Sequence, residues 1–265
     1  MEEQSNSSFK IRGFFTKIRI CINSINGFLF HSLYCKFSIR DKSIRKVIIN
    51  SNVNYYDKTC IALIDSLVKY GVKKGDIILM VGGYSKIEKF NYYGVESYFL
   101  DNNSIDYTAF IGILELNLTN DIDYFFYIHD TTVIYSNKFA NVFYKYPVKK
   151  RYAYSIGTFI SMNIGFYSKE SLIKSKTLIM NTKNTDYSQE AIYNSKVLGF
   201  EMEDAIFKNN FKYRKTIFSG YSFPIVNKTI YVGQERIEEN FKQLGILKYK
   251  ANSNHLGKYR TTLTD

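Results

Sequence analysis

The residues best suited to chemistry stand at the end of an apolar run. Residues 124–128 are aromatic or β-branched, which is typical of a buried strand. His129, Asp130 and Thr131 follow directly. A carboxylate at the tip of a buried strand is held rigidly, and hard divalent cations commonly bridge such carboxylates to substrate phosphates. We therefore expect Asp130 to bind a metal ion with His129 and Thr131 beside the ligand. Alternatively, Asp130 has a structural role and caps the turn that follows the strand.

Two later groups could take part in the same chemistry. Glu203 and Asp204 precede the apolar residues 205–207, and this pattern predicts a helix that begins at the acidic pair. Acids in the first turn of a helix are stabilised by its dipole. A carboxylate near an acceptor could instead take the proton of an attacking hydroxyl. His255 lies in a polar stretch, where it either ligates a metal ion or a phosphate or is exposed to solvent.

The elements that must position these residues alternate between strands and helices. Apolar runs typical of strands occur at 46–50, 76–83 and 97–100, and apolar residues at helical spacing occur at 57–71 and 104–116. This alternation predicts βαβ units and a mainly parallel central sheet flanked by helices. In such sheets, ligands bind beyond the carboxyl ends of the strands. We therefore expect the functional residues at that edge.

Polar or flexible residues follow each predicted strand. They are Asn50, Ser51 and Asn52 after the first strand, Gly82 and Gly83 after the second, Asp101, Asn102 and Asn103 after the third, and His129 with Asp130 after the fourth. Because the carboxyl ends of parallel strands meet at one edge, we expect these groups to converge on one pocket. Ordinary polar loops would place similar residues there, so the expectation depends on the convergence and not on any single residue.

Length and composition limit the class of protein. The chain has 265 residues, of which 45% are hydrophobic, which is enough for one large domain or for a domain with an extension. A net charge of +12 attracts anions, whether nucleic acid, an anionic membrane or phosphate-bearing small molecules. The three cysteines form no closely spaced pair, which favours a reducing cytoplasm.

Residues 1–45 form a predicted basic, amphipathic extension. Lys10, Arg12, Lys17 and Arg19 alternate with apolar residues, and no run reaches the roughly 20 apolar residues that a membrane span needs. Two interpretations stand for this segment. It is either a helix that lies on an anionic membrane surface, or a helix or hairpin that packs on the main domain.

The order of these motifs resembles that of nucleotide-sugar glycosyltransferases with the GT-A fold, of the type that makes bacterial polysaccharides and cell-surface glycans. The DxD motif of that family would correspond to residues 129–131, with one acid replaced, and its xED motif to residues 202–204. Its C-terminal metal-binding histidine would correspond to His255. The segment 101–110 also resembles the helix entry that contacts the nucleotide, which adds Asn103 and Asp106 to the candidate binding residues.

The resemblance implies a Rossmann-like GT-A fold over residues 46–265. It also implies a nucleoside-diphosphate sugar as donor, a glycan or lipid-linked acceptor, and a divalent metal ion, Mn²⁺ or Mg²⁺, held by Asp130 and His255. Asp204, with Glu203 beside it, would be the catalytic base of a single displacement that inverts the anomeric carbon. Such an enzyme would work in the cytoplasm, with peripheral contact to the inner face of the membrane.

Two other classes of function remain open from the sequence. The positive charge and the many tyrosines suit a nucleic-acid-binding protein, but the sequence contains no helix-turn-helix, RRM or zinc-finger spacing, so we expect no nucleic-acid partner. A nucleotidyltransferase or another phosphate-transfer enzyme could use a similar sheet. No P-loop motif is present, and Gly82-Gly83 is too short to form one.

Overall fold

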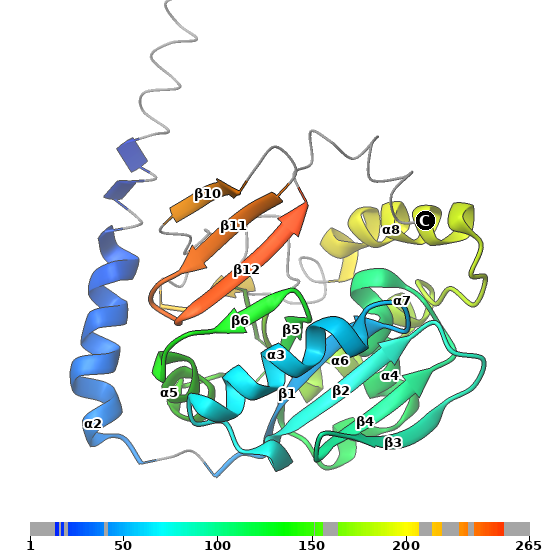
Figure 1. The fold of residues 1–265 in the computed structure, drawn as a ribbon. Helices are drawn as coiled ribbons and strands as arrows, with labels where there is room; N and C mark the ends of the chain where they lie inside the picture. The colour runs from blue at the N-terminus through cyan, green and yellow to red at the C-terminus, as the bar shows by residue number, and fades with distance from the viewer. Residues whose placement is uncertain are drawn as a thin grey trace, which may run out of the picture.

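The computed structural model describes residues 14–15, 17–18, 21–39, 42–150, 152–155, 164–206, 214–218, 228–232 and 236–251. These residues form a central sheet, a smaller second sheet and helices (Figure 1). The central sheet contains β1 (Arg45–Asn52), β2 (Ile77–Gly82), β3 (Glu88–Tyr92), β4 (Val95–Leu100), β5 (Tyr124–His129), β7 (Ala153–Ser155), β8 (Gly165–Ser168) and β9 (Arg214–Thr216). The second sheet contains β6 (Thr132–Ile134), β10 (Lys228–Val232), β11 (Arg236–Phe241) and β12 (Ile246–Ala251).

The helices vary in length and include several single turns. The α-helices are α2 (Cys35–Phe37), α3 (Tyr56–Lys69), α4 (Thr108–Glu115), α5 (Lys138–Lys145), α6 (Lys169–Lys174), α7 (Lys176–Met180) and α8 (Gln189–Asp204). Short 3₁₀ turns are η2 (Lys74–Asp76), η3 (Ile105–Tyr107) and η4 (Leu118–Asn120), and η1 (Phe30–Tyr34) is a π-helical turn. No helix in the described part of the chain is long and apolar enough to cross a membrane.

The strand order of the central sheet is β3-β4-β2-β1-β5-β8-β7-β9. Strands β4, β2, β1, β5, β7 and β9 run in one direction, while β3 and β8 run in the other. The predicted α/β class, with a mainly parallel central sheet flanked by helices, is therefore confirmed. The four neighbours β4-β2-β1-β5 have the order 3-2-1-4 found in doubly wound sheets, which is compatible with a Rossmann-like fold.

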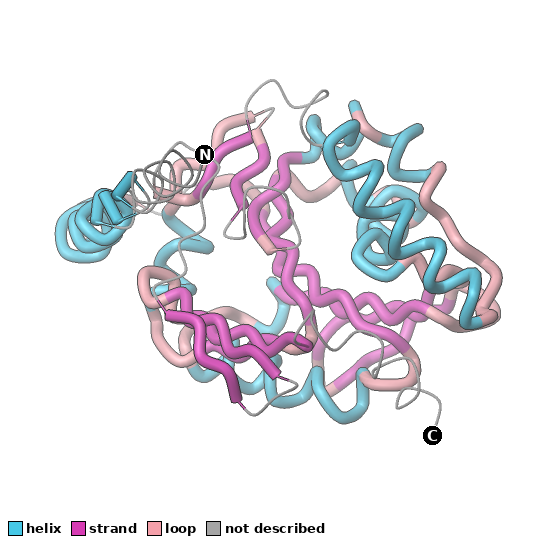
Figure 2. Tube along the Cα trace, turned by 90° about the horizontal axis from the view of Figure 1, so that it is seen from above, coloured by secondary structure: helices cyan, strands magenta, loops and turns pink. Residues whose placement is uncertain are grey.

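Each face of the central sheet is covered because its strands are apolar on both sides. Along β5, Phe126 and Ile128 belong to the core under α3 and α5, while Phe125 and Tyr127 belong to the core under α4. This division follows from the two-residue alternation of side chains in a strand. Figure 2 shows the helices on both sides of the sheet when it is viewed from above.

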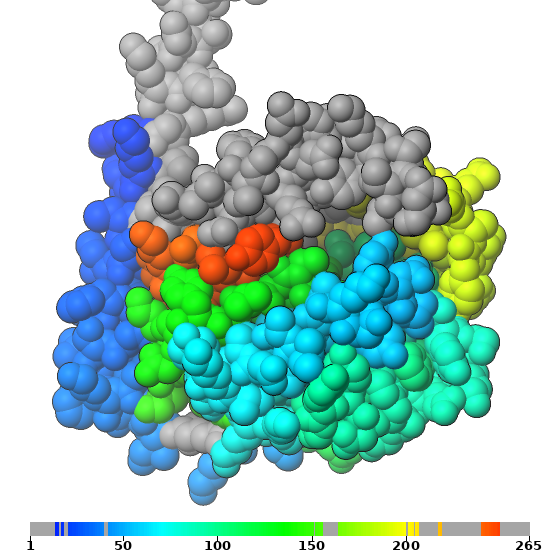
Figure 3. Space-filling model, in the orientation of Figure 1, coloured from blue at the N-terminus to red at the C-terminus, as the bar shows by residue number. Residues whose placement is uncertain are grey.

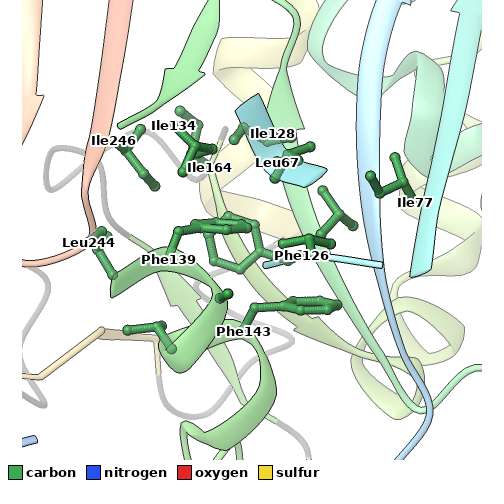
Figure 4. Packing of buried hydrophobic residues seen from close by; sticks show 14 of the residues in the cluster. Leu67, Ile77, Phe126, Ile128, Ile134, Phe139, Phe143, Ile164, Leu244 and Ile246 are labelled. Atoms are coloured by element: carbon green, nitrogen blue, oxygen red, sulfur yellow. The ribbon is translucent and has the colours of Figure 1, made fainter. Parts of the chain in front are cut away.

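The second sheet shares the core beneath α5. Phe139 of α5 meets Phe126 edge to face, with ring centroids 4.9 Å apart. Ile134 of β6 and Ile246 of β12 join the same cluster, which Figure 4 shows around Phe139. Strand β6 begins two residues after Asp130 and pairs with β12. Asp130 therefore lies where the chain passes from the central sheet to the second sheet.

The N-terminal segment packs on this body through one face of a helix. Residues 21–29 are helical, and η1 and α2 continue the helix to Phe37. Phe30 belongs to the main core, where its ring lies 5.6 Å from that of Tyr146 and 5.3 Å from that of Phe218. The described part of this segment thus packs on the main domain through one face, as the packed interpretation expects.

Several elements differ from the predictions. Strands β9, β10, β11 and β12 were not predicted. Edge strand β3 was not predicted; it forms a hairpin with β4 through Tyr93-Gly94, whose φ angles are +52° and +79°. Two positive φ angles are typical of the tight hairpin turn, but the Tyr-Gly pair gives little warning of it. The predicted helix start at Glu203-Asp204 is wrong. Helix α8 begins after Ser188, whose hydroxyl accepts a hydrogen bond from the Ala191 amide, and the acidic pair forms its last turn.

We expect Phe139 to be essential for joining the two sheets. Its side chain is fully buried, so Phe139→Ala should lower the free energy of unfolding by about 3–5 kcal/mol, measured by urea denaturation. The matched control is Phe37→Ala, because Phe37 is 81% exposed and its truncation leaves no cavity. Equal stability of the two variants would contradict a core shared by both sheets.

Candidate functional site

The candidate site lies at the carboxyl ends of β1 and β5. Strands β2 and β4 follow β1 in the sheet on one side, and β5 pairs with β1 on its other side. The order of the strands therefore reverses between β1 and β5. A reversal of this kind is where ligands bind in open α/β sheets. Asn50 of β1 is directly opposite His129 of β5, so the residues that follow, Ser51 and Asp130, are also neighbours.

Strand alternation divides these residues between the two faces of the sheet. Asn50 and His129 point to the α4 face, where Tyr127 lies beside the His129 ring with a centroid distance of 5.4 Å. Ser51 and Asp130 point to the α3 face, where they hydrogen bond to each other. His129 and Asp130 are therefore consecutive in sequence but serve opposite sides of the same edge.

Asp130 is held by two hydroxyl groups. Ser51 Oγ donates to Asp130 Oδ2 at 2.5 Å, and Thr59 Oγ1 of α3 donates to the same oxygen at 3.0 Å. The Asp130 amide also donates to the Asn50 carbonyl at 3.2 Å. Hydrogen bonds to a carboxylate are stronger than those between neutral groups, so Asp130 is firmly oriented. Thr59 was not predicted as a site residue. The sequence shows only that it is a hydroxyl residue in the first turn of the helix that follows β1.

The thiol next to Thr59 does not supply a nucleophile. Cys60 is fully buried beneath Ser51 and Asp130. Burial raises the pKa of the Cys60 thiol to about 12, and the nearby Asp130 charge acts in the same direction. Because the thiolate is the reactive form, Cys60 is inert at neutral pH and serves as packing.

Asp130 could supply one oxygen for a metal ion. Both hydroxyl hydrogen bonds go to Oδ2, and within the described part of the chain none reaches Oδ1. Across those same residues, no three His, Cys, Asp or Glu side chains gather closely enough to enclose a metal ion. This donor set does not make a protein cage, but it fits a hard cation that takes most of its ligands from substrate phosphates and water. The predicted second ligand, His255, lies outside the described residues.

On the α4 face, Asn50 ties the strand end to the next helix. Its side-chain amide donates to the Ile105 carbonyl at 3.0 Å and accepts from the Ala109 amide at 3.1 Å. Ile105 has φ +51°, which is strained for a β-branched residue. This backbone carries Asp106, whose carbonyl accepts a hydrogen bond from Tyr127 Oη at 2.6 Å. The predicted Asn50 and Asp106 are thus brought together through Ile105.

His129 is a neutral, partly buried imidazole. Burial lowers the pKa of His129; the Asp106 carboxylate opposes this shift, and the Lys248 ammonium adds to it. His129 Nε2 lies 3.5 Å from Asp106 Oδ1 but makes no hydrogen bond within the described part of the chain. At pH 7 the contact is therefore a polar proximity and not an ion pair.

Lys248 brings a cation to this edge from the second sheet. It is buried, and it is opposite Thr132 in the ladder between β12 and β6. The amide of the next residue, Tyr249, donates to the Thr131 carbonyl at 2.9 Å. No role for Lys248 was predicted, because nothing local in the sequence reveals that β12 pairs with a strand more than 100 residues earlier. The predicted Thr131 is exposed at this junction.

The ends of β2 and β4 complete the edge. A Cβ at Gly82 would lie 2.7 Å from the Asn102 carbonyl oxygen and 2.5 Å from the Thr108 side chain, so only glycine fits. A Cβ at Gly83 would lie 3.4 Å from the Asn52 amide nitrogen and 4.0 Å from that of Asn103. The predicted convergence of these strand ends is therefore present in the structure.

The polar loop between α7 and α8 forms hydrogen bonds and an ion pair with residues at the end of β4. The backbone of Asn184 makes two hydrogen bonds here: the Asn103 amide donates to the Asn184 carbonyl at 2.8 Å, and the Asn184 amide donates to the side-chain Ser104 Oγ at 2.8 Å. Lys183 forms ion pairs with Asp101 at 3.0 Å and Glu115 at 2.6 Å. The loop between α7 and α8 thus belongs to the site edge, although its sequence indicates only an ordinary mobile connection.

The acidic pair lies on the same side as Asp106. Helix α8 packs on η3, where Gly199 lies beside the Tyr107 ring. Glu203, one turn later, is buried, and Asp204 is the last residue of the helix. The structure thus brings the end of α8 to the α4 face, and the roles predicted for Glu203 and Asp204 remain predictions.

Comparisons with known proteins do not add to this picture. No model of a protein family matches the chain, and no curated protein matches it.

We expect Asn50 to hold the α4 face of the site. Asn50→Ala removes two hydrogen bonds and leaves the buried Ala109 amide without its acceptor, so it should lower the free energy of unfolding by about 2 kcal/mol. Asn54→Ala is the control, since Asn54 is exposed two residues beyond the strand. Thermal and urea unfolding should separate the two variants; a stability of Asn50→Ala equal to the control would contradict this role.

Proposed function

We propose that this protein is a glycosyltransferase with a GT-A-like fold, which transfers a sugar from a nucleoside-diphosphate sugar to a glycan or lipid-linked acceptor. The observation that carries the proposal is the placement of Asp130. It stands at the reversal point of the sheet, held by Ser51 and Thr59, and its second oxygen makes no hydrogen bond to a described residue. The order of the sequence motifs supplies the link to glycosyl transfer.

The edge of the sheet offers suitable groups for a nucleoside. The side-chain amides of Asn52 and Asn103 lie near Gly83, and amides can pair with both donors and acceptors of a base or ribose. The loop held by Lys183 and Asn184 closes the outer side of this region. A nucleotide bound here would place its phosphates toward β1 and β5, in the direction of Asp130.

Transfer from a diphosphate requires that the leaving charge be neutralised. Lys248 is a buried cation at this edge, and the net charge of +12 favours an anionic donor. Mn²⁺ or Mg²⁺, when bound, would neutralise the diphosphate as a Lewis acid, with Asp130 Oδ1 as its ligand and His255 as the second ligand implied by the resemblance. His129 is neutral and can orient polar groups without repelling the metal ion.

The acceptor hydroxyl must lose its proton. By the resemblance, Asp204 takes this proton, with Glu203 beside it, and a single displacement inverts the anomeric carbon. The packing of α8 on η3 supports this assignment, because it brings the end of the helix to the side of the sheet that carries Asp106.

The direct test is a screen of donor hydrolysis and transfer across UDP-, GDP-, CMP- and dTDP-sugars, with and without Mn²⁺. Release of nucleotide from one donor class, stimulated by an acceptor, supports the proposal. Transfer of a nucleotidyl group with release of pyrophosphate would replace it with a nucleotidyltransferase.

Asp130→Asn should reduce transfer by at least about 10²-fold, because the amide lacks the negative charge that would hold the metal ion. The fold should remain, as judged by circular dichroism. Asp65→Asn is the matched control, since Asp65 is an exposed carboxylate on the same helix as Thr59. Activity of Asp130→Asn near that of the wild type would remove Asp130 from the mechanism.

Asp204→Asn should lose sugar transfer without losing donor binding. Removal of a base slows chemistry by about 10²–10⁴-fold while donor binding persists, so isothermal titration calorimetry should show nearly unchanged nucleotide affinity. The stereochemistry is an independent check. An NMR spectrum that shows retained anomeric configuration in the product would contradict Asp204 as the base of a single displacement.

A further inference from the structure

The N-terminal helix presents its polar side to the protein. Asn26 donates to the Phe218 carbonyl at 2.8 Å, and His31 Nε2 donates to the Gln243 carbonyl at 2.7 Å. The side-chain amide of Gln243 donates in turn to Ser24 Oγ at 2.9 Å. Apart from Phe30 and Cys35, the helix is therefore attached largely through hydrogen bonds.

Its opposite side is apolar and exposed. Figures 1 and 3 show the helix along one side of the molecule. The exposed side chains recur at intervals of three or four residues, which places them on one face: Phe14, Ile18, Ile22, Ile25, Phe28 and Leu29. Phe28 is 68% exposed and Ile25 is 53% exposed. A helix on the surface of a soluble protein normally has the reverse arrangement, with its apolar stripe toward the core.

The charge of the segment identifies the surface that would cover this face. Residues 4–40 contain no acidic residue, but they contain six basic ones: Lys10, Arg12, Lys17, Arg19, Lys36 and Arg40. A second copy of the chain would bring six like charges against six, which opposes pairing. An anionic lipid surface attracts them, and each Lys or Arg near such a surface contributes about 1 kcal/mol.

We propose that the outward face of this helix binds in the interface of an anionic lipid bilayer, with the helix lying along the membrane. Its apolar side chains would enter the boundary between head groups and acyl chains, while Lys17 and Lys36 would contact the head groups. The absence of a membrane-spanning helix among the described residues fits a helix that lies on the bilayer. This inference does not depend on the proposed sugar transfer.

The test is flotation of the full chain with vesicles of phosphatidylcholine alone or mixed with phosphatidylglycerol. We expect binding to the anionic vesicles at least about tenfold tighter than to neutral ones, and weaker binding as salt is raised. The double variant Ile25→Ser/Phe28→Ser should bind at least about tenfold more weakly, because it removes two side chains that would be buried in lipid. Lys17→Gln/Arg19→Gln should also weaken binding to the anionic vesicles.

Ile173→Ser is the matched control, because Ile173 of α6 is 53% exposed, as is Ile25, but lies far from the helix in sequence. It should bind vesicles like the wild type, and thermal unfolding should show all variants folded. Equal vesicle binding by Ile25→Ser/Phe28→Ser and the wild type would overturn the proposal. The proposal would also be overturned if the wild-type protein did not bind anionic vesicles but self-associated through Ile25 and Phe28, as measured by analytical ultracentrifugation.

Discussion

The parallel pairing of β1 with β5 is the constraint on which the rest of the site depends. It sets Asn50 opposite His129 and therefore Ser51 beside Asp130. A slip of β5 by one residue in this pairing would turn its side chains to the opposite faces and separate Asp130 from Ser51. The buried aromatic residues of β5 prevent the slip, because Phe126 fits the core under α5 and Tyr127 fits the core under α4.

The two faces of this edge have different chemical character. On the α3 side, two hydroxyl groups orient a carboxylate over an inert, buried thiol. On the α4 side, a neutral imidazole lies beside Asp106, and hydrogen bonds from Asn50 and Tyr127 fix the backbone at Ile105 and Asp106. The second sheet closes the arrangement from above and contributes Lys248. A ligand that spans both faces would meet fixed negative, neutral and positive groups within one short edge.

Local patterns in the sequence were sufficient to predict the strands that carry the site and the convergence of their ends. Both predictions depend on the spacing of apolar residues and on the residues at turns, which are local properties. They were not sufficient for Thr59 and Lys248, whose roles come from contacts with residues distant in the chain. The end of α8 was misjudged because acids usually begin helices, and here Ser188 caps a helix of weak amphipathicity. The apolar residues of the N-terminal helix were recognised, but only the structure shows that they face outward.

The central claim is that a nucleoside diphosphate binds across the carboxyl ends of β1, β2, β4 and β5. Amide hydrogen exchange followed by mass spectrometry tests it directly, with the protein alone and with the nucleoside diphosphate that gives the largest thermal shift in a panel of UDP, GDP and dTDP. The account predicts protection in peptides that contain residues 50–53, 82–84, 101–106 and 128–131. Protection concentrated instead on the N-terminal helix or on α5, with these strand ends unchanged, would contradict it.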